Sequence, residues 1–177
     1  HHVAAPQALL AAWHRALAVD GFVMFSCLGP DTLKQLRALY GRLGWPAPAH
    51  EFTDMHDWGD QLVAAGFAEP VMDMETLTLQ FESPERLLAE LRELGRNLAV
   101  GRFGALRGRD WRARLLAELD KGLRQPAPGG PLTLTFEVIY GHALKPAPRH
   151  AVAGQTHIAL DDMRASLRTR QQNSRRS

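Results

Sequence analysis

The sequence predicts an α/β fold, in which helices pack on the faces of a β-sheet. Segments with apolar residues at helical spacing alternate along the chain with segments of strand type. The strand-type segments are apolar throughout or alternate apolar and polar residues. The resulting order is helix, strand, helix, helix, strand, helix, helix, strand, over about residues 6–144. Alternation of this kind is typical of α/β sheets, although three strands are few for the class.

The first helix is expected over residues 6–18, where Pro6 suits the first turn. The run FVMFSCL, residues 22–28, is apolar almost throughout. This composition predicts a buried strand of the kind found in parallel sheets.

A sharp turn and a second helix are expected to follow this strand. Gly29 and Pro30 turn the chain, after which helical spacing resumes. Asp31 is one candidate N-cap, and Thr32 with Gln35 has the spacing of a capping box.

The remaining elements are predicted from the same periodicities. Ser83 is the expected N-cap of a helix whose first turn contains Pro84, and Asp110 is the expected N-cap of the last predicted helix. The expected helices cover residues 56–65, 84–94 and 111–124, and the expected strands cover residues 71–81 and 132–144.

Composition favours a soluble cytoplasmic protein. The chain has 177 residues, 45% of them hydrophobic, which suits one compact domain. No apolar run approaches the ~18 residues of a membrane span, and the first residues do not resemble a signal peptide. The single cysteine excludes an internal disulfide and fits a reducing compartment.

Charge divides the chain into two expected parts. The net charge is +2, but residues 163–177 carry five arginines and no acid. We therefore expect a domain over residues 1–148 and a basic, disordered tail over residues 149–177. No zinc-ligand spacing or aromatic-glycine RNA motif accompanies the tail, so we expect no nucleic-acid partner.

Three stretches resemble parts of the class I S-adenosylmethionine-dependent methyltransferases. LLAAWHRALAVDGFVMFSCLGPDTLKQL is similar to the fifth-strand region of that class, LVAAGFAEPVMDMETLTLQF to its late helix and sixth strand, and PLTLTFEVIYGHALKP to its last strand. Within the class, FSCLGPDTLKQLR, FTDMHDWGD and EVIYGHA most resemble the malonyl-acyl-carrier-protein methyltransferases of biotin synthesis. The resemblance extends to about Pro148.

The resemblance implies a partial Rossmann-like methyltransferase fold: strands 5, 6 and 7 with flanking helices, the C-terminal portion of a longer parent. The class binds S-adenosylmethionine mainly through a glycine-rich turn in its first half, and this sequence has no such turn after a strand. The main cofactor site is therefore expected in a missing upstream half, with no cofactor-binding residue in this chain, and the fragment alone is expected to be inactive.

The implied reaction is methylation of the free carboxyl of a malonyl thioester carried by an acyl carrier protein. This carboxyl is ionised at neutral pH, so the site must hold a carboxylate by charge-assisted hydrogen bonds, preferably from arginine. No catalytic residue is assigned. The substrate-binding candidates are Ser26, Gly29, Asp31, His56, Arg92 and Arg96.

Simpler interpretations remain open for these residues. Gly29 can serve only to turn the chain, and Asp31 can serve only to cap a helix. The stretch DMHDWGD, residues 54–60, concentrates acids and a histidine, but a helix start accounts for most of it and no metal site is expected.

A basic patch follows the fourth predicted helix. Residues 102–114 contain five arginines and one acid, and acyl carrier proteins are strongly acidic, so such a patch would steer their approach. A solvated surface is the alternative. The candidate carrier-binding residues are Arg102, Arg107, Arg109 and Arg112.

Two other functions stay open at this point. Complex I assembly factors of the protein-arginine hydroxylase type, from the same broad family, have a similar turn before a helix. A non-catalytic interaction module that lacks the cofactor half would also retain these elements.

Overall fold

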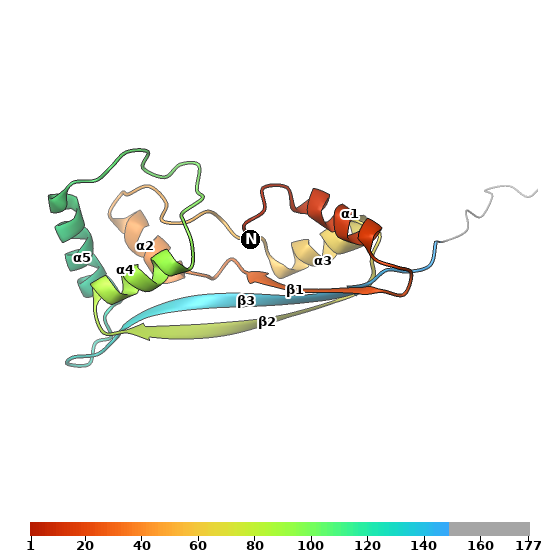
Figure 1. Ribbon diagram of the computed structural model, residues 1–177. Helices are drawn as coiled ribbons and strands as arrows, with labels where there is room; N and C mark the ends of the chain where they lie inside the picture. Colours follow the sequence, from red (N-terminus) through yellow and green to blue (C-terminus); the bar gives the residue numbers. More distant parts are fainter. Residues whose placement is uncertain (149–177) are drawn as a thin grey trace, which may run out of the picture. The chain divides into compact units, whose positions relative to one another are not determined.

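The computed structural model describes residues 1–148, and the predicted basic tail over residues 149–177 lies outside the described residues. Residues 1–147 form one unit with helices and a single three-stranded sheet (Figure 1). In chain order the elements are α1 (Pro6–Ala16), β1 (Phe22–Leu28), α2 (Lys34–Arg42), α3 (Met55–Ala64), β2 (Ala68–Phe81), α4 (Pro84–Glu93), α5 (Arg109–Leu123) and β3 (Leu132–Leu144). The predicted order of helices and strands is confirmed.

The sheet has the strand order β1-β3-β2, and β3 runs antiparallel to both neighbours. The prediction that residues 22–28 form a buried strand of a parallel sheet is therefore wrong on both counts. Phe22 and Met24 are 56% and 74% exposed, and the only fully buried residue of β1 is Cys27. An apolar run shows that a strand is suited to burial, but it does not determine the direction of the neighbouring strand.

Two hydrophobic clusters lie at the two ends of β3. Leu134 and Phe136 pack with side chains of α2, α4 and α5, whereas Ile139 and Ala143 pack with side chains of α1 and α3. Because successive strand residues point to opposite faces, the strand changes the face that it buries between these two ends. In Figure 1 the two groups of helices accordingly gather at opposite ends of the sheet.

The start of α2 differs from its prediction. The helix begins at Lys34 after Leu33, which has a φ of 58°, and no side chain caps it. The predicted caps are wrong because Thr32 and Gln35 bond instead to β3: Gln35 Nε2 donates to Thr135 Oγ1, and Gln35 Oε1 accepts from Thr135 N–H at 3.0 Å. Long-range contacts thus replace the local capping box.

The other helix ends follow the sequence more closely. Ser83 caps α4 as predicted, its Oγ accepting from Arg86 N–H at 3.2 Å. Asp110 does not cap α5: Gly108 occupies the N-cap position, and Asp110 lies in the first turn, where its charge still suits the helix dipole. Among the described residues, no helix is long and apolar enough to cross a membrane.

Candidate functional site

The turn after β1 is fastened to Glu137 of β3. Gly29 N–H donates to the Glu137 carbonyl oxygen at 2.9 Å, and Asp31 N–H donates to Glu137 Oε2 at 2.8 Å. Thr32, which is fully buried, exchanges two hydrogen bonds of 3.1 Å with the backbone of Glu137. These contacts fix the path of the chain where it leaves the carboxyl end of β1.

Gly29 lies close to two side chains of β3. A Cβ atom there would lie 2.8 Å from the Glu137 carboxyl group and 2.9 Å from Ile139 Cδ1. Gly29 and Asp31 both position the turn through Glu137, and their role in substrate binding stays a prediction. Sequence analysis did not single out Glu137; its one available signal is an acid within the otherwise apolar strand LTLTFEVIYGHAL.

A cavity of about 480 Å³, which we call the arginine pocket, opens beside this turn. Arg92 and Arg96, two predicted substrate-binding residues, line it together with Leu28 at the end of β1. Arg92 lies in the last turn of α4, and Arg96 follows Gly95, which has a φ of 138°. The pocket is completed by His1, His2, Thr32, Leu33, Leu36, Pro48, Ala49, His50, Phe52, Leu88, Leu91, Leu94, Gly95, Asn97 and Phe136.

Hydrogen bonds from Asn97 connect two loops at this pocket. Its Nδ2 donates to the carbonyl oxygen of Ala47 at 3.2 Å, and its Oδ1 accepts from Ala99 N–H at 2.8 Å. The loop after α4 is thereby joined to the proline-rich loop before α3. One bond therefore ties the loop that carries Arg96 to its neighbour, and the other shapes that loop itself.

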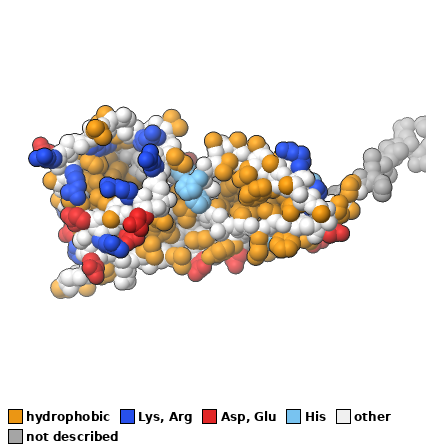
Figure 2. Space-filling model, viewed as in Figure 1, with side chains coloured by type: hydrophobic (Ala, Val, Ile, Leu, Met, Phe, Trp, Pro, Cys, Tyr) orange, Lys and Arg blue, Asp and Glu red, His pale blue; other side chains and the backbone are white. Residues whose placement is uncertain are grey.

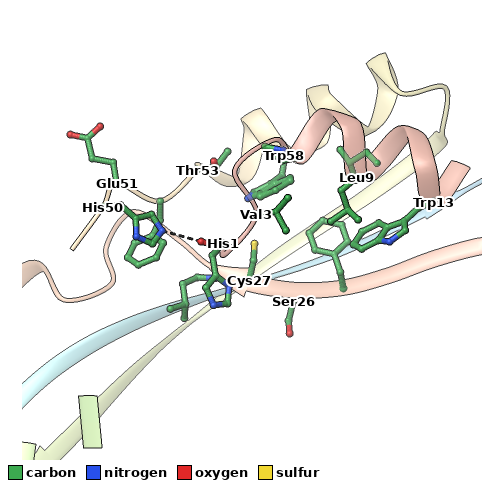
Figure 3. Close-up of a pocket in the computed structure, with 15 residues that line it drawn as sticks. His1, Val3, Leu9, Trp13, Ser26, Cys27, His50, Glu51, Thr53 and Trp58 are labelled. Atoms are coloured by element: carbon green, nitrogen blue, oxygen red, sulfur yellow. Dashed lines mark hydrogen bonds between the residues drawn. The ribbon is translucent and has the colours of Figure 1, made fainter. Parts of the chain in front are cut away.

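A second cavity of about 220 Å³, which we call the tryptophan pocket, lies where α1, α3 and the end of β1 meet (Figure 3). Its walls include Leu10, Trp13, Phe25, Cys27 and Trp58. Burial raises the pKa of the Cys27 thiol, so the thiolate is disfavoured there. The remaining lining residues are His1, Val3, Pro6, Leu9, Ser26, Leu28, His50, Glu51, Phe52 and Thr53.

Ser26 contributes to this pocket differently from Cys27. Figure 3 shows the Cys27 side chain on the side of β1 that carries Trp58, whereas the Ser26 side chain points to the opposite side. The alternation of strand side chains explains the difference. The structure therefore does not direct the Ser26 hydroxyl toward this cavity.

His56 lies outside both pockets, at the start of α3. Asp54 is the N-cap: its Oδ1 accepts from His56 N–H at 2.7 Å and lies 2.8 Å from His56 Nδ1. These hydrogen bonds lower the pKa of the Asp54 carboxyl below its usual value. Helix capping accounts for DMHDWGD, and no group of three or more metal-ligating side chains is found in residues 1–148.

The predicted carrier-binding arginines occupy two kinds of position. Arg107 is packed, with its guanidinium 4.2 Å from the ring centre of Phe103 and 4.1 Å from that of Trp111. Arg109 and Arg112 are exposed on the first turn of α5, and Arg102 Nη1 bonds the Ala99 carbonyl oxygen at 3.4 Å. Figure 2 shows basic side chains, with some acids among them, at this end of the molecule.

Comparison with known proteins places these features in a family context. The chain is 50% identical over 137 residues to malonyl-[acyl-carrier protein] O-methyltransferase of Gallionella capsiferriformans, covering 77% of this chain and 46% of that protein. It is 46% identical over 145 residues to the protein of the same name from Laribacter hongkongensis, covering 81% of this chain and 48% of the relative. The chain thus spans about half the length of these curated relatives.

A solved structure supports the same fold. The YcgJ protein of Bacillus subtilis matches with a TM-score of 0.50 and 15% identity, over 84% of this chain and 61% of that structure. This likeness concerns the fold alone. No protein-family model matches the chain. The fold is α/β, part of a Rossmann-like methyltransferase fold, and over most of its length the chain is homologous to the malonyl-[acyl-carrier protein] O-methyltransferases.

Proposed function

We propose that this chain is the C-terminal, substrate-binding portion of an S-adenosylmethionine-dependent methyltransferase that esterifies a malonyl thioester on an acyl carrier protein. The observation that carries the proposal is the placement of Arg92 and Arg96 in one cavity with the carboxyl end of β1. The activity for which the relatives are named favours this reaction over protein-arginine hydroxylation and over a non-catalytic role.

The arginine pocket suits a carboxylate with an apolar body. Two guanidinium groups can each donate paired hydrogen bonds to carboxylate oxygens. Leu33, Leu36 and Phe136 provide apolar surface on the remaining wall. Because a malonate carboxylate is already ionised at neutral pH, these residues need to bind and orient it, and no general base is required.

The cofactor would supply the methyl group, and its main site is proposed to lie outside this chain. The connection from the carboxyl end of β1 into α2 contains Gly29-Pro30-Asp31, and Glu137 fills the space beside Gly29. The shorter connection from β2 into α4 contains no glycine. This turn lacks the open glycine-rich cradle that a nucleotide cofactor requires. The relatives are about twice as long as the matched region, which leaves room for such a cradle elsewhere.

The proposed docking surface for the carrier protein consists of Arg102, Arg109 and Arg112, with Arg107 supporting it. Arg107 is held between two aromatic rings and therefore stabilises the loop that carries Arg102. Arg109 and Arg112 are exposed and can meet the acidic surface of a carrier protein directly. Of the remaining candidates, Gly29 and Asp31 are proposed to shape the site through the turn. No role is proposed for Ser26, whose side chain points away from the tryptophan pocket (Figure 3), or for His56, which lies outside both pockets.

The proposal is tested by methyl transfer in a chimaera. The part of the Gallionella capsiferriformans relative that this chain does not match is fused before it, and labelled methyl transfer from S-adenosylmethionine to malonyl-carrier protein is measured. Loss of either arginine, by Arg92→Gln or Arg96→Gln, is expected to lower kcat/KM about 10- to 100-fold, as the loss of a charge-assisted hydrogen bond predicts. Arg15→Gln on α1, away from both pockets, is the matched control. An active chimaera that tolerates both pocket substitutions would refute the carboxylate site.

A further inference from the structure

The tryptophan pocket contains a buried hydrogen-bond donor without a partner. Trp58 is 8% exposed, and its Nε1 has no hydrogen-bond acceptor within the described residues. Buried indole N–H groups usually find a partner, because leaving one unpaired costs about 1–3 kcal/mol. Trp58 forms part of the cavity wall, so an occupant of that cavity can supply the acceptor.

The chemistry of the walls limits what that occupant can be. Leu10, Trp13, Phe25 and Cys27 surround Trp58, and no lysine or arginine lines the cavity. A carboxylate placed there would find no lysine or arginine, and Glu51, which also lines the cavity, carries the same charge. The cavity therefore suits a neutral acceptor on an apolar body.

The two pockets are neighbours that share four lining residues. His1, Leu28, His50 and Phe52 line both cavities. One pocket offers two cationic side chains, and the other offers the unpartnered indole N–H of Trp58 among mostly apolar side chains, with no lysine or arginine. A malonyl thioester carries the matching pair of groups, a carboxylate and a thioester carbonyl, separated by one methylene.

We propose that the tryptophan pocket binds the thioester end of the substrate, with Trp58 Nε1 donating a hydrogen bond to the thioester carbonyl oxygen. This inference rests on the proposed function and adds a specificity-determining residue to it. This pocket selects thioesters over free acids, because a free malonate would place its second charge where no lysine or arginine stands and where Glu51 carries the same charge.

The test follows the indole N–H signals of the isotopically labelled 177-residue chain by NMR. The chain has four tryptophans, and Trp58→Phe identifies the Trp58 signal. Trp111 is the internal control: its Nε1 is also buried and unpartnered in the described structure, but it lines neither pocket. The probes are acetyl-pantetheine, which has the thioester but no carboxylate, and the thioether of equal length, which has no thioester carbonyl.

Acetyl-pantetheine is expected to shift the Trp58 signal saturably and to leave the Trp111 signal in place. Trp58→Phe is expected to weaken its binding about 2- to 10-fold, the range for one neutral hydrogen bond. An equal shift with the thioether, or no binding of acetyl-pantetheine, would overturn the inference.

Malonyl-pantetheine separates this inference from the proposed function. If malonyl-pantetheine binds in an arginine-dependent manner without moving the Trp58 signal, the thioester contact is refuted and the carboxylate site stands. If both thioesters shift the Trp58 indole signal, but Arg92→Gln and Arg96→Gln leave the affinity for malonyl-pantetheine unchanged, the thioester contact stands and the carboxylate site is refuted.

Discussion

Asp31 and Glu137 are joined by a hydrogen bond of 2.8 Å although they lie 106 positions apart in the sequence. The Asp31 backbone N–H donates, and the buried Glu137 carboxylate accepts. Through this bond β3 fixes the turn that follows β1. The stretches FSCLGPDTLKQLR and EVIYGHA, which both resemble methyltransferase sequences, are therefore joined in one structural unit.

Replacing Glu137 should destabilise the domain. Glu137→Ala leaves Asp31 N–H without its acceptor, and a buried unpaired donor costs about 1–3 kcal/mol. Glu137→Gln keeps an oxygen in place and should cost less. Urea unfolding measures both changes, with Glu82→Ala, an exposed acid just after β2, as the control. Equal stability of Glu137→Ala and the unchanged chain would contradict the proposed fastening of the turn.

Two glycines should respond in opposite ways to the same substitution. Gly29→Ala forces a methyl group against the Glu137 carboxyl and Ile139, so a loss of about 1–3 kcal/mol is expected from overpacking. Gly41 lies within α2, and nothing stands within 4 Å of its added Cβ. Gly41→Ala should therefore stabilise the chain by about 0.5–1 kcal/mol, because alanine is the better helix former. Thermal unfolding of both variants checks the opposite signs, and a neutral Gly29→Ala would contradict the close approach seen here.

The sequence predicts most of this fold because its local signals are strong. Ser83 before Pro84 marks the start of α4, and the apolar run of residues 22–28 and the alternation over residues 71–81 mark strands. The errors occur where a distant residue takes over a local role. Thr32 and Gln35 have capping-box spacing, yet both bond to β3, a competition that a local pattern cannot reveal.

The candidate site was predictable only in part, for the same reason. Arg92 and Arg96 could be selected by residue type, since a carboxylate requires cationic partners. The partnership of Glu137 with the turn, and the unpartnered indole of Trp58, depend on contacts between elements far apart in the chain. His56 was selected from a local cluster whose simpler explanation, capping of α3 by Asp54, is the one that the structure shows.

Asp54 should make stability depend on pH. Its hydrogen bonds with His56 lower the pKa of the folded-state carboxyl, so its stabilising contribution is complete above the unfolded-state pKa and is lost as the pH falls through the folded-state pKa. Asp54→Asn retains a capping side chain that does not titrate. Urea midpoints of both proteins between pH 6 and pH 3 should show the unchanged chain losing more stability. A difference that stays constant over this range would show that Asp54 does not contribute through its charge.

The exposed arginines of α5 should control how fast a carrier protein binds. Charge reversal by Arg109→Glu with Arg112→Glu is expected to slow association with malonyl-carrier protein about tenfold or more at low salt, and to weaken its salt dependence. Stopped-flow association measurements test this expectation, with Arg15→Glu on α1 as the matched charge reversal. If the Arg15 variant slows association equally, overall charge rather than a docking surface is responsible.

The central claim is that this chain binds the substrate carboxylate and that the main cofactor site lies outside it. The most direct measurement is calorimetric titration of the 177-residue chain with malonyl-pantetheine and, separately, with S-adenosylhomocysteine. We predict saturable binding of malonyl-pantetheine that Arg92→Gln and Arg96→Gln weaken, and no measurable binding of S-adenosylhomocysteine. Tight binding of S-adenosylhomocysteine to the chain alone, with no binding of malonyl-pantetheine, would contradict the claim.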